Sequence, residues 1–271
     1  MDFLEEIIQY KIKETEERKS LYPVKLLEKS IHFGAPVVSL KKYLLRPDKS
    51  GIIAEIKRKS PSKGMINRHV SIERTSLGYM MAGASALSVL TDEKYFAGSS
   101  QDLMTARKYN FCPILRKDFI VDEYQVIESK SIGADAILLI AAVLDPARLK
   151  SLAALARSLN LEVLLEVHHE NEIRSLAVDG FDLVGINNRD LKSFEVNIDT
   201  SIKLGSRLPG GTVRIAESGI NSPGTVIRLK ESGFHGFLIG EYFMSSSRPE
   251  KACDEFIHSL MRLQKSKLPI P

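Results

Sequence analysis

Cysteine is scarce in this chain. Among 271 residues there are only two cysteines, Cys112 and Cys253, which lie far apart and have no pattern of neighbouring metal ligands. A disulfide framework or a zinc site needs several such residues at short, characteristic spacings. Neither is therefore expected, and a reducing cytoplasm is the natural compartment for the chain.

Long hydrophobic runs are also missing. The longest, from Ala136 to Leu144, is bounded by Asp135 and Asp145, and it is much shorter than the roughly 20 apolar residues that span a bilayer. The opening stretch, MDFLEEIIQYKIKETEERK, is acidic where a signal peptide would be basic, and it lacks a continuous apolar core. We therefore expect neither a membrane segment nor a targeting segment.

A basic stripe or tail, the usual sign of nucleic-acid binding, is absent as well. The net charge is +4, but lysine and arginine are scattered among the acidic residues. The densest basic cluster, Lys57-Arg58-Lys59, follows a predicted strand and has no interleaved aromatic residues for stacking bases. The charge balance suits a small anionic ligand better than a nucleic acid.

Strand and helix patterns alternate along most of the chain. Predicted strands lie at about 51–57, 86–90, 113–119, 136–142, 162–167, 183–187, 213–217 and 236–239. Helices are predicted at about 72–81, 99–109, 122–131, 145–159, 171–178 and 199–207, after Ser222-Pro223, and from Arg248-Pro249 towards Leu263. Two further helices, one opening at Phe3 and one at about 24–31, precede the first strand.

This alternation predicts an α/β fold, a (β/α)8 TIM barrel with an N-terminal helical extension. The repeat is about 26 residues long, which agrees with a barrel of roughly 250 residues. We expect one domain over residues 1–271, with the extension at 1–50 and the barrel at 51–271. An open doubly wound sheet is a weaker alternative, since Ser60-Pro61-Ser62 stands where a glycine-rich dinucleotide turn would be expected.

Polar residues end several predicted strands, on the inward phase of the alternation. They are Glu55, Lys57, Lys117, Glu166, Asn187 and Glu217. Because active sites of such barrels lie at the carboxyl ends of the strands, this placement predicts a functional mouth. The alternative is that these charges form a structural ionic layer inside the barrel.

The loops after the last two strands contain glycines. Ser218-Gly219 follows one strand and Gly240-Glu241 the next, with a short helix predicted at 242–244. Backbone N–H groups at these positions favour a phosphate site, although the glycines can also be simple turn residues. The Glu241 carboxylate opposes phosphate binding unless its side chain points away.

Apolar residues offer a pocket wall beside the charges. Phe96, Phe119, Leu90, Leu138 and Ile140 are candidates, with ordinary barrel filling as the alternative. The adjacent His168 and His169 face opposite ways on a strand, which is poor geometry for one metal ion. Solvent contact and loop packing are expected for them.

Seven motifs resemble those of the indole-3-glycerol phosphate synthase family, and they cover nearly all of the chain. They are IIAEIKRKSPSKG (52–64), ALSVLTDEKYFAGS (86–99), PILRKDFIVDEYQ (113–125), LLEVH (164–168), GINNRDL (185–191), AESGI (216–220) and LIGE (238–241). The resemblance implies ring closure, decarboxylation and dehydration of 1-(2-carboxyphenylamino)-1-deoxyribulose 5-phosphate in tryptophan biosynthesis. Glu241 is a position where some members have serine.

The resemblance also implies roles for individual residues. Lys117 is the general acid that activates the substrate carbonyl, and Glu166 handles a proton in the later loss of hydroxyl. Lys57, held by Glu55, contacts the leaving carboxylate and assists dehydration. The implied substrate-orienting residues are Asn187, Glu217 and Arg189, and the other implied binding residues are Ser60, Phe96, Phe119, Leu138, Ser218, Gly219, Gly240 and Glu241.

No metal or organic cofactor is required by this chemistry, because the imine intermediate itself accepts the electrons released on decarboxylation. The expected partner is a phosphorylated small molecule, and the chain is expected to act as a monomer. One alternative is another phosphate-binding barrel enzyme such as phosphoribosylanthranilate isomerase, for which a Cys and Asp pair would be expected where this chain has Lys117. A second is a non-catalytic barrel that binds a phosphorylated ligand or a protein, but buried charge at five strand ends would then serve no purpose.

Overall fold

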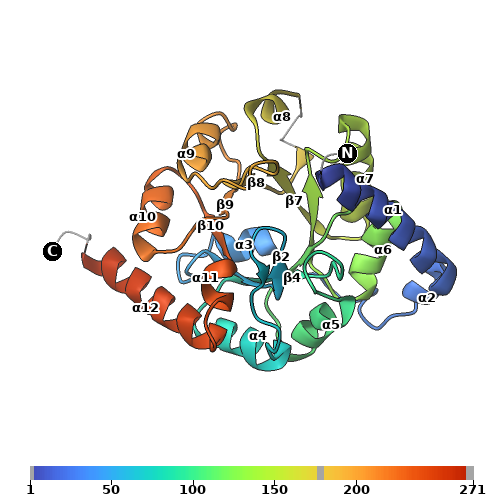
Figure 1. Ribbon diagram of the computed structural model, residues 1–271, viewed down its shortest axis with the longest axis horizontal. Helices are drawn as coiled ribbons and strands as arrows, with labels where there is room; N and C mark the ends of the chain where they lie inside the picture. The colour runs from blue at the N-terminus through green and yellow to red at the C-terminus, as the bar shows by residue number, and fades with distance from the viewer. Residues whose placement is uncertain (1–2, 176–179, 267–271) are drawn as a thin grey trace.

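The computed structural model describes residues 3–175 and 180–266 and has a closed barrel of eight parallel strands at its centre (Figure 1). Strand β1 pairs with both β10 and β4, which closes the sheet without a free edge. The predicted TIM barrel is confirmed. The barrel strands are β1 (Ile52–Ile56), β4 (Ala86–Leu90), β5 (Ile114–Lys117), β6 (Ala136–Ile140), β7 (Glu162–Val167), β8 (Leu183–Asn187), β9 (Arg214–Glu217) and β10 (Gly236–Ile239).

Helices surround the barrel, and most begin at a side chain that caps the first turn. Ser71, Ser99 and Ser222 accept a hydrogen bond from the backbone three residues on, and Asp145 caps a helix whose first residue is Pro146. The outer helices are α4 (Ile72–Met81), α5 (Ser100–Tyr109), α6 (Glu123–Ser131), α7 (Pro146–Ser158), α8 (Glu170–Ser175), α9 (Asp199–Gly205), α10 (Pro223–Glu231), the short α11 (Glu241–Met244) and α12 (Pro249–Ser266). The last three residues of the helix predicted at 171–178 lie outside the described residues.

Alternation along the strands separates two apolar layers. In β1, Ile52, Ala54 and Ile56 face the surrounding helices, whereas Ile53 faces the barrel interior with Leu115 of β5. Glu55 is therefore inward, as its sequence phase predicts. The same inward phase carries the charged residues at the other strand ends towards the axis.

In the described part of the chain, three helices precede β1. They are α1 (Phe3–Leu21), α2 (Val24–Leu27) and α3 (Leu40–Leu44). Leu40 and Leu44 of α3 join the interior cluster and close the end of the barrel opposite the pocket. This helix was not predicted, and the helix predicted at 24–31 ends at Leu27 and continues as turns.

Two other differences lie at the mouth of the barrel. A short hairpin of β2 (Lys59–Ser60) and β3 (Gly64–Met65) occupies the loop after β1, where only a turn was predicted. Strand β5 ends at Lys117, so Asp118 and Phe119 belong to the following loop. Within the described residues, no helix has the length and apolar character needed to cross a membrane.

Candidate active site

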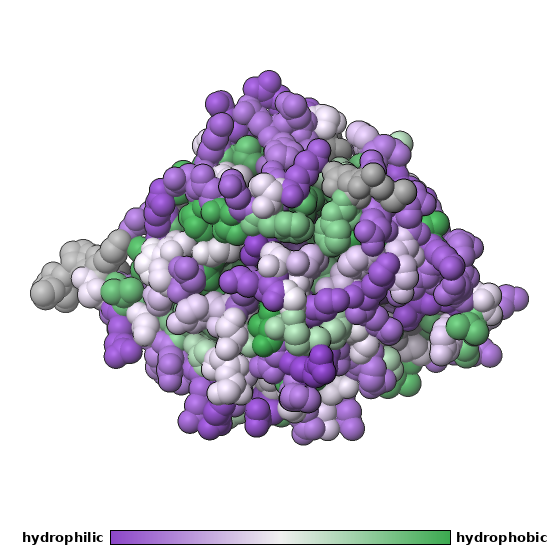
Figure 2. Space-filling model, viewed as in Figure 1, coloured by the Kyte–Doolittle hydropathy of each residue, from purple (hydrophilic) through white to green (hydrophobic). Residues whose placement is uncertain are grey.

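A large pocket opens at the carboxyl ends of the strands, with a volume of about 960 Å³. Apolar side chains gather near the middle of this face and hydrophilic ones occupy its periphery (Figure 2). All six residues predicted from the strand ends line the pocket: Glu55, Lys57, Lys117, Glu166, Asn187 and Glu217. The predicted convergence of these residues is therefore observed.

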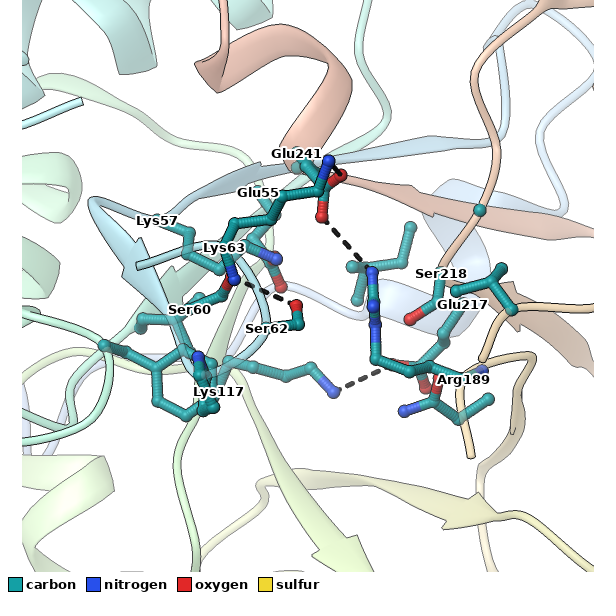
Figure 3. Close-up of a pocket in the computed structure, with 18 of the residues that line it drawn as sticks. Glu55, Lys57, Ser60, Ser62, Lys63, Lys117, Arg189, Glu217, Ser218 and Glu241 are labelled. Carbon is teal, nitrogen blue, oxygen red and sulfur yellow. Dashed lines mark hydrogen bonds and ion pairs between the residues drawn. The ribbon is translucent and has the colours of Figure 1, made fainter. Parts of the chain in front are cut away.

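Lys117 lies at the centre of the polar floor (Figure 3). Its Nζ donates to Glu166 Oε2 at 2.6 Å and to Glu217 Oε2 at 2.8 Å. These two carboxylates come from β7, two strands from β5, and from β9, on the opposite side of the barrel. The ammonium thus spans the interior, and its free face is turned to the pocket.

Burial and charge pull the pKa values of these three groups apart. Burial opposes the charged form of Lys117, but the carboxylates of Glu166 and Glu217 outweigh it and raise the pKa of the ammonium. Burial also opposes the charged form of Glu166, yet Lys117 and His168 hold the pKa of that carboxyl well below its usual range. For Glu217, burial and the neighbouring Glu166 charge prevail over Lys117 and raise the pKa to about 7. One carboxylate is ionised at neutral pH while the other is close to its titration point.

A second ion pair occupies the end of β1. Lys57 Nζ lies 2.8 Å from Glu55 Oε1, and Glu55 is only 3% exposed. A Cβ at Gly240 would overlap this carboxylate. Gly240 is therefore required to make room for Glu55, a reason distinct from the predicted approach of its backbone to phosphate.

Gly185 has the same relation to Glu217. It lies inside β8, and a Cβ there would overlap Glu217 Oε1. A glycine in a strand interior is otherwise unfavourable, because it has no side chain to pack. In the sequence, Gly185 was noted only as the first residue of the GINNRDL motif, although a glycine inside a buried strand was a usable signal.

Asn187 and Arg189 extend the polar network from β8. Asn187 Nδ2 donates to Glu166 Oε1 at 3.2 Å, and its Oδ1 accepts from the backbone N–H of Arg189 at 3.0 Å. The Arg189 guanidinium reaches Glu241 Oε2 at 3.2 Å. Glu241 is also 3.5 Å from Lys63 Nζ of the β2–β3 turn. The Glu241 side chain therefore points among the pocket cations (Figure 3), contrary to the orientation that phosphate binding by its N–H alone would need.

The predicted phosphate-binding residues lie around the same rim. Ser60, Ser218, Gly219 and Gly240 all line the pocket. Ser218 and Gly219 have φ angles of 68° and 76°, and two successive residues in this region turn the backbone sharply between β9 and α10. Ser60, in the β2–β3 hairpin, faces Ser62 with 3.4 Å between their Oγ atoms.

The apolar wall comes from four parts of the chain. Phe96 and Phe119 line the pocket with ring centroids 6.2 Å apart, and Leu138 lies nearby on β6. Phe3, Leu4 and Ile7 of α1 complete the wall. The sequence predicted only that a helix opens at Phe3, because helical periodicity does not show what the apolar face of a helix covers.

His168 departs from its prediction. It is 5% exposed, and its Nε2 lies 3.2 Å from Glu166 Oε1. Burial opposes its charged form, but Glu166 outweighs burial and raises the pKa of the imidazole. The expectation of solvent contact is wrong for this residue, since the inward phase it shares with Glu166 carries it into the interior beside that carboxylate.

The pocket lies at the end of the barrel where barrel enzymes bind substrate, so the fold and the site together define an enzyme of the (β/α)8-barrel class. The family model described as Indole-3-glycerol phosphate synthase matches residues 4–256. The chain belongs to the indole-3-glycerol phosphate synthase family.

Curated relatives agree over almost the whole length. The chain is 45% identical over 259 residues to indole-3-glycerol phosphate synthase of Bacteroides thetaiotaomicron, covering 96% of this chain and 99% of the relative. It is 41% identical over 260 residues to the protein of that name from Carboxydothermus hydrogenoformans, covering 93% and 98%. Among solved structures, 3-hexulose-6-phosphate synthase from Salmonella typhimurium has a TM-score of 0.61 at 13% identity, covering 78% of this chain and 98% of that one. That likeness shows the barrel fold alone.

Proposed function

We propose that the pocket converts 1-(2-carboxyphenylamino)-1-deoxyribulose 5-phosphate into indole-3-glycerol phosphate, with Lys117 as the general acid. As a member of its family, the chain is a decarboxylating lyase of tryptophan biosynthesis. The observation that supports the assignment of Lys117 is its ammonium, held between Glu166 and Glu217 at the pocket floor. A buried, charged donor at this position can stabilise negative charge that develops on a carbonyl oxygen.

Ring closure is the first step. The aromatic carbon that bears the carboxylate attacks the substrate carbonyl, and the carbonyl oxygen takes a proton from Lys117. The C–CO2 bond then breaks and its electron pair returns to the ring system, which releases carbon dioxide. Phe96 and Phe119 supply an apolar wall for the ring, and Lys57, fixed by Glu55, faces the leaving carboxylate.

Dehydration completes the indole. The hydroxyl formed in the first step leaves as water after Lys57 donates a proton to it, and Glu166 accepts the proton that the ring loses. The low pKa of Glu166 keeps it ionised and ready to accept this proton. Asn187, Glu217 and Arg189 orient the remaining hydroxyls.

The phosphate is proposed to bind at the rim formed by Ser60, Ser218, Gly219 and Gly240. Backbone N–H groups in the two glycine turns are the expected donors. Lys63 and Arg189 flank the rim and are paired with Glu241. Phosphate binding therefore has to compete with the Glu241 carboxylate for these cations.

Turnover of the purified chain is the direct test. Because the sequence has no tryptophan, indole fluorescence arises only from the product. The parent should generate the signal, and Lys117→Ala should abolish it while circular dichroism and thermal unfolding remain those of a folded barrel. Lys59→Ala is the matched control, since the Lys59 ammonium bonds to the Lys94 carbonyl outside the pocket. Activity of Lys117→Ala within a few-fold of the parent would refute the mechanism.

The enzyme is proposed to act as a monomer in a reducing cytoplasm. Two free, buried cysteines suit that compartment.

A further inference from the structure

Lys11, in the middle of α1, is one of the most deeply buried side chains in the described part of the molecule. The residue is 1% exposed. Its Nζ lies 2.6 Å from Glu14 Oε2, 2.8 Å from Asp92 Oδ2 and 3.0 Å from Asp118 Oδ1. A buried ammonium is stable only when nearby carboxylates compensate its charge. The positions of these carboxylates therefore show which loops of the barrel the helix is attached to.

Asp92 organises the loop after β4. Its Oδ1 accepts from the backbone N–H of Tyr95 at 2.7 Å and of Phe96 at 3.2 Å. The second oxygen of the same carboxylate faces Lys11. The position of the Phe96 ring is thus tied, through one carboxylate, to the N-terminal helix.

Asp118 does the same for the loop after β5. It directly follows Lys117, and its Oδ1 accepts from the backbone N–H of Phe119 at 2.8 Å. The same oxygen faces the Lys11 ammonium. Arg116 NH2 donates to the other oxygen at 3.2 Å, which holds the carboxylate in place.

One ammonium therefore links two loops that each carry a ring of the pocket wall, Phe96 and Phe119. We infer that Lys11 is a positioning residue that sets the spacing of this aromatic wall and so the affinity for the substrate's aromatic ring. This inference rests on the proposed function for the identity of the ring. Lys11 acts through Asp92 and Asp118 and does not itself line the pocket.

A purely structural anchor of α1 is the competing explanation, and the same helix provides a matched control. Arg18 Nε donates to Glu128 Oε1 of α6 at 2.8 Å, and its NH2 reaches Ser100 Oγ at 3.3 Å. Arg18 also fastens α1 to the barrel, and it makes no direct contact with Asp92 or Asp118. Its partner Glu128 is also paired with Arg116 at 2.7 Å, so this carboxylate remains compensated when Arg18 is removed. Loss of either anchor weakens helix docking, whereas only loss of Lys11 releases the ring-bearing loops.

The experiment compares Lys11→Met with Arg18→Met. Two affinities are measured for each: that of indole-3-glycerol phosphate, by its fluorescence, and that of inorganic phosphate, by competition with that product. In Lys11→Met we expect product affinity to fall at least tenfold while the inorganic phosphate constant stays within twofold of the parent. In Arg18→Met we expect both constants to stay within twofold. Equal losses in the two variants, or an unchanged product affinity in Lys11→Met, would overturn the inference.

A second variant tests the inference if Lys11→Met fails to fold. Lys11→Met combined with Asp92→Asn removes one uncompensated charge and keeps an oxygen that accepts from Tyr95 and Phe96. The same loss of product affinity is expected, and parental affinity in this variant would equally overturn the inference. Turnover of the parent is measured separately. A parent without turnover refutes the proposed function, whereas an active parent with unaffected Lys11 variants refutes only the positioning role.

Discussion

Glu166 and Glu217 share the ammonium of Lys117, and their pKa values move in opposite directions. Two carboxylates close to one cation in a buried site do not both ionise freely, so the pair titrates in two well-separated steps. Glu166 is held ionised, while Glu217 keeps its proton up to about pH 7. Glu166 is therefore ionised and available to accept a proton, and protonated Glu217 is able to donate a hydrogen bond to a substrate oxygen.

Glu217 should make folding less favourable as pH rises. Its folded pKa of about 7 exceeds the ordinary value of 4.5, so the folded state holds more protons between these pH values and stability declines across that window. Glu217→Gln removes this decline. The free energy of unfolding of the variant relative to the parent should therefore increase by about 3 kcal/mol from pH 4.5 to above pH 7, as measured by urea titration.

The exposed Glu255→Gln on α12 serves as the control for the Glu217 measurement. A Glu217→Gln difference that does not change with pH would mean that the carboxyl titrates normally.

Glu241 should weaken binding of the substrate phosphate. It neutralises Lys63 and Arg189 and places a negative charge beside the rim. Glu241→Ser is expected to lower KM about fivefold at low ionic strength, equivalent to roughly 1 kcal/mol of charge interaction near a protein surface. The effect should shrink in high salt, which screens exposed charges. Steady-state kinetics at two salt concentrations test this, with Glu255→Ser as a charge-matched control, and a raised KM would contradict the competition between Glu241 and phosphate.

Single residues were predicted well where a local rule applied and missed where three-dimensional contact decided. The inward phase of Glu55, Lys117, Glu166 and Glu217 follows from strand alternation alone. The phase of His168 follows from the same rule, but its burial depends on the elements that cover the end of β7, which the local sequence does not show. The orientation of Glu241 depended on cations from two other loops.

At the scale of elements, β8 contains a glycine whose missing side chain matters to the site. Gly185 leaves the space that the Glu217 carboxylate fills. Gly185→Ala should displace this carboxylate from Lys117 and reduce kcat about 100-fold, the cost of a misplacement of about 1 Å. The variant should still fold, because the cost falls on one side chain.

Kinetics and thermal unfolding of Gly185→Ala are compared with those of Gly210→Ala, where an added Cβ meets open space. Parental kcat in Gly185→Ala would show that Glu217 has room to adjust.

Regular elements were predictable because each carries its own periodic signal and cap. The β2–β3 hairpin and α3 were not, since each is only a few residues long and is stabilised by contacts with the barrel. Helix α3 is stabilised by the packing of Leu40 and Leu44 into the end of the barrel. Such tertiary contacts leave little trace in local sequence.

At the scale of the whole molecule, the first and last helices of the chain lie at different distances from the pocket mouth. Helix α1 begins at the mouth, where Phe3 forms part of the wall, whereas α12 packs on α4 and α10 in the outer ring (Figure 1). A bulky group attached to the first turn of α1 would therefore narrow the entrance for substrate. A fluorescent label on the exposed face of α12 would leave that entrance clear.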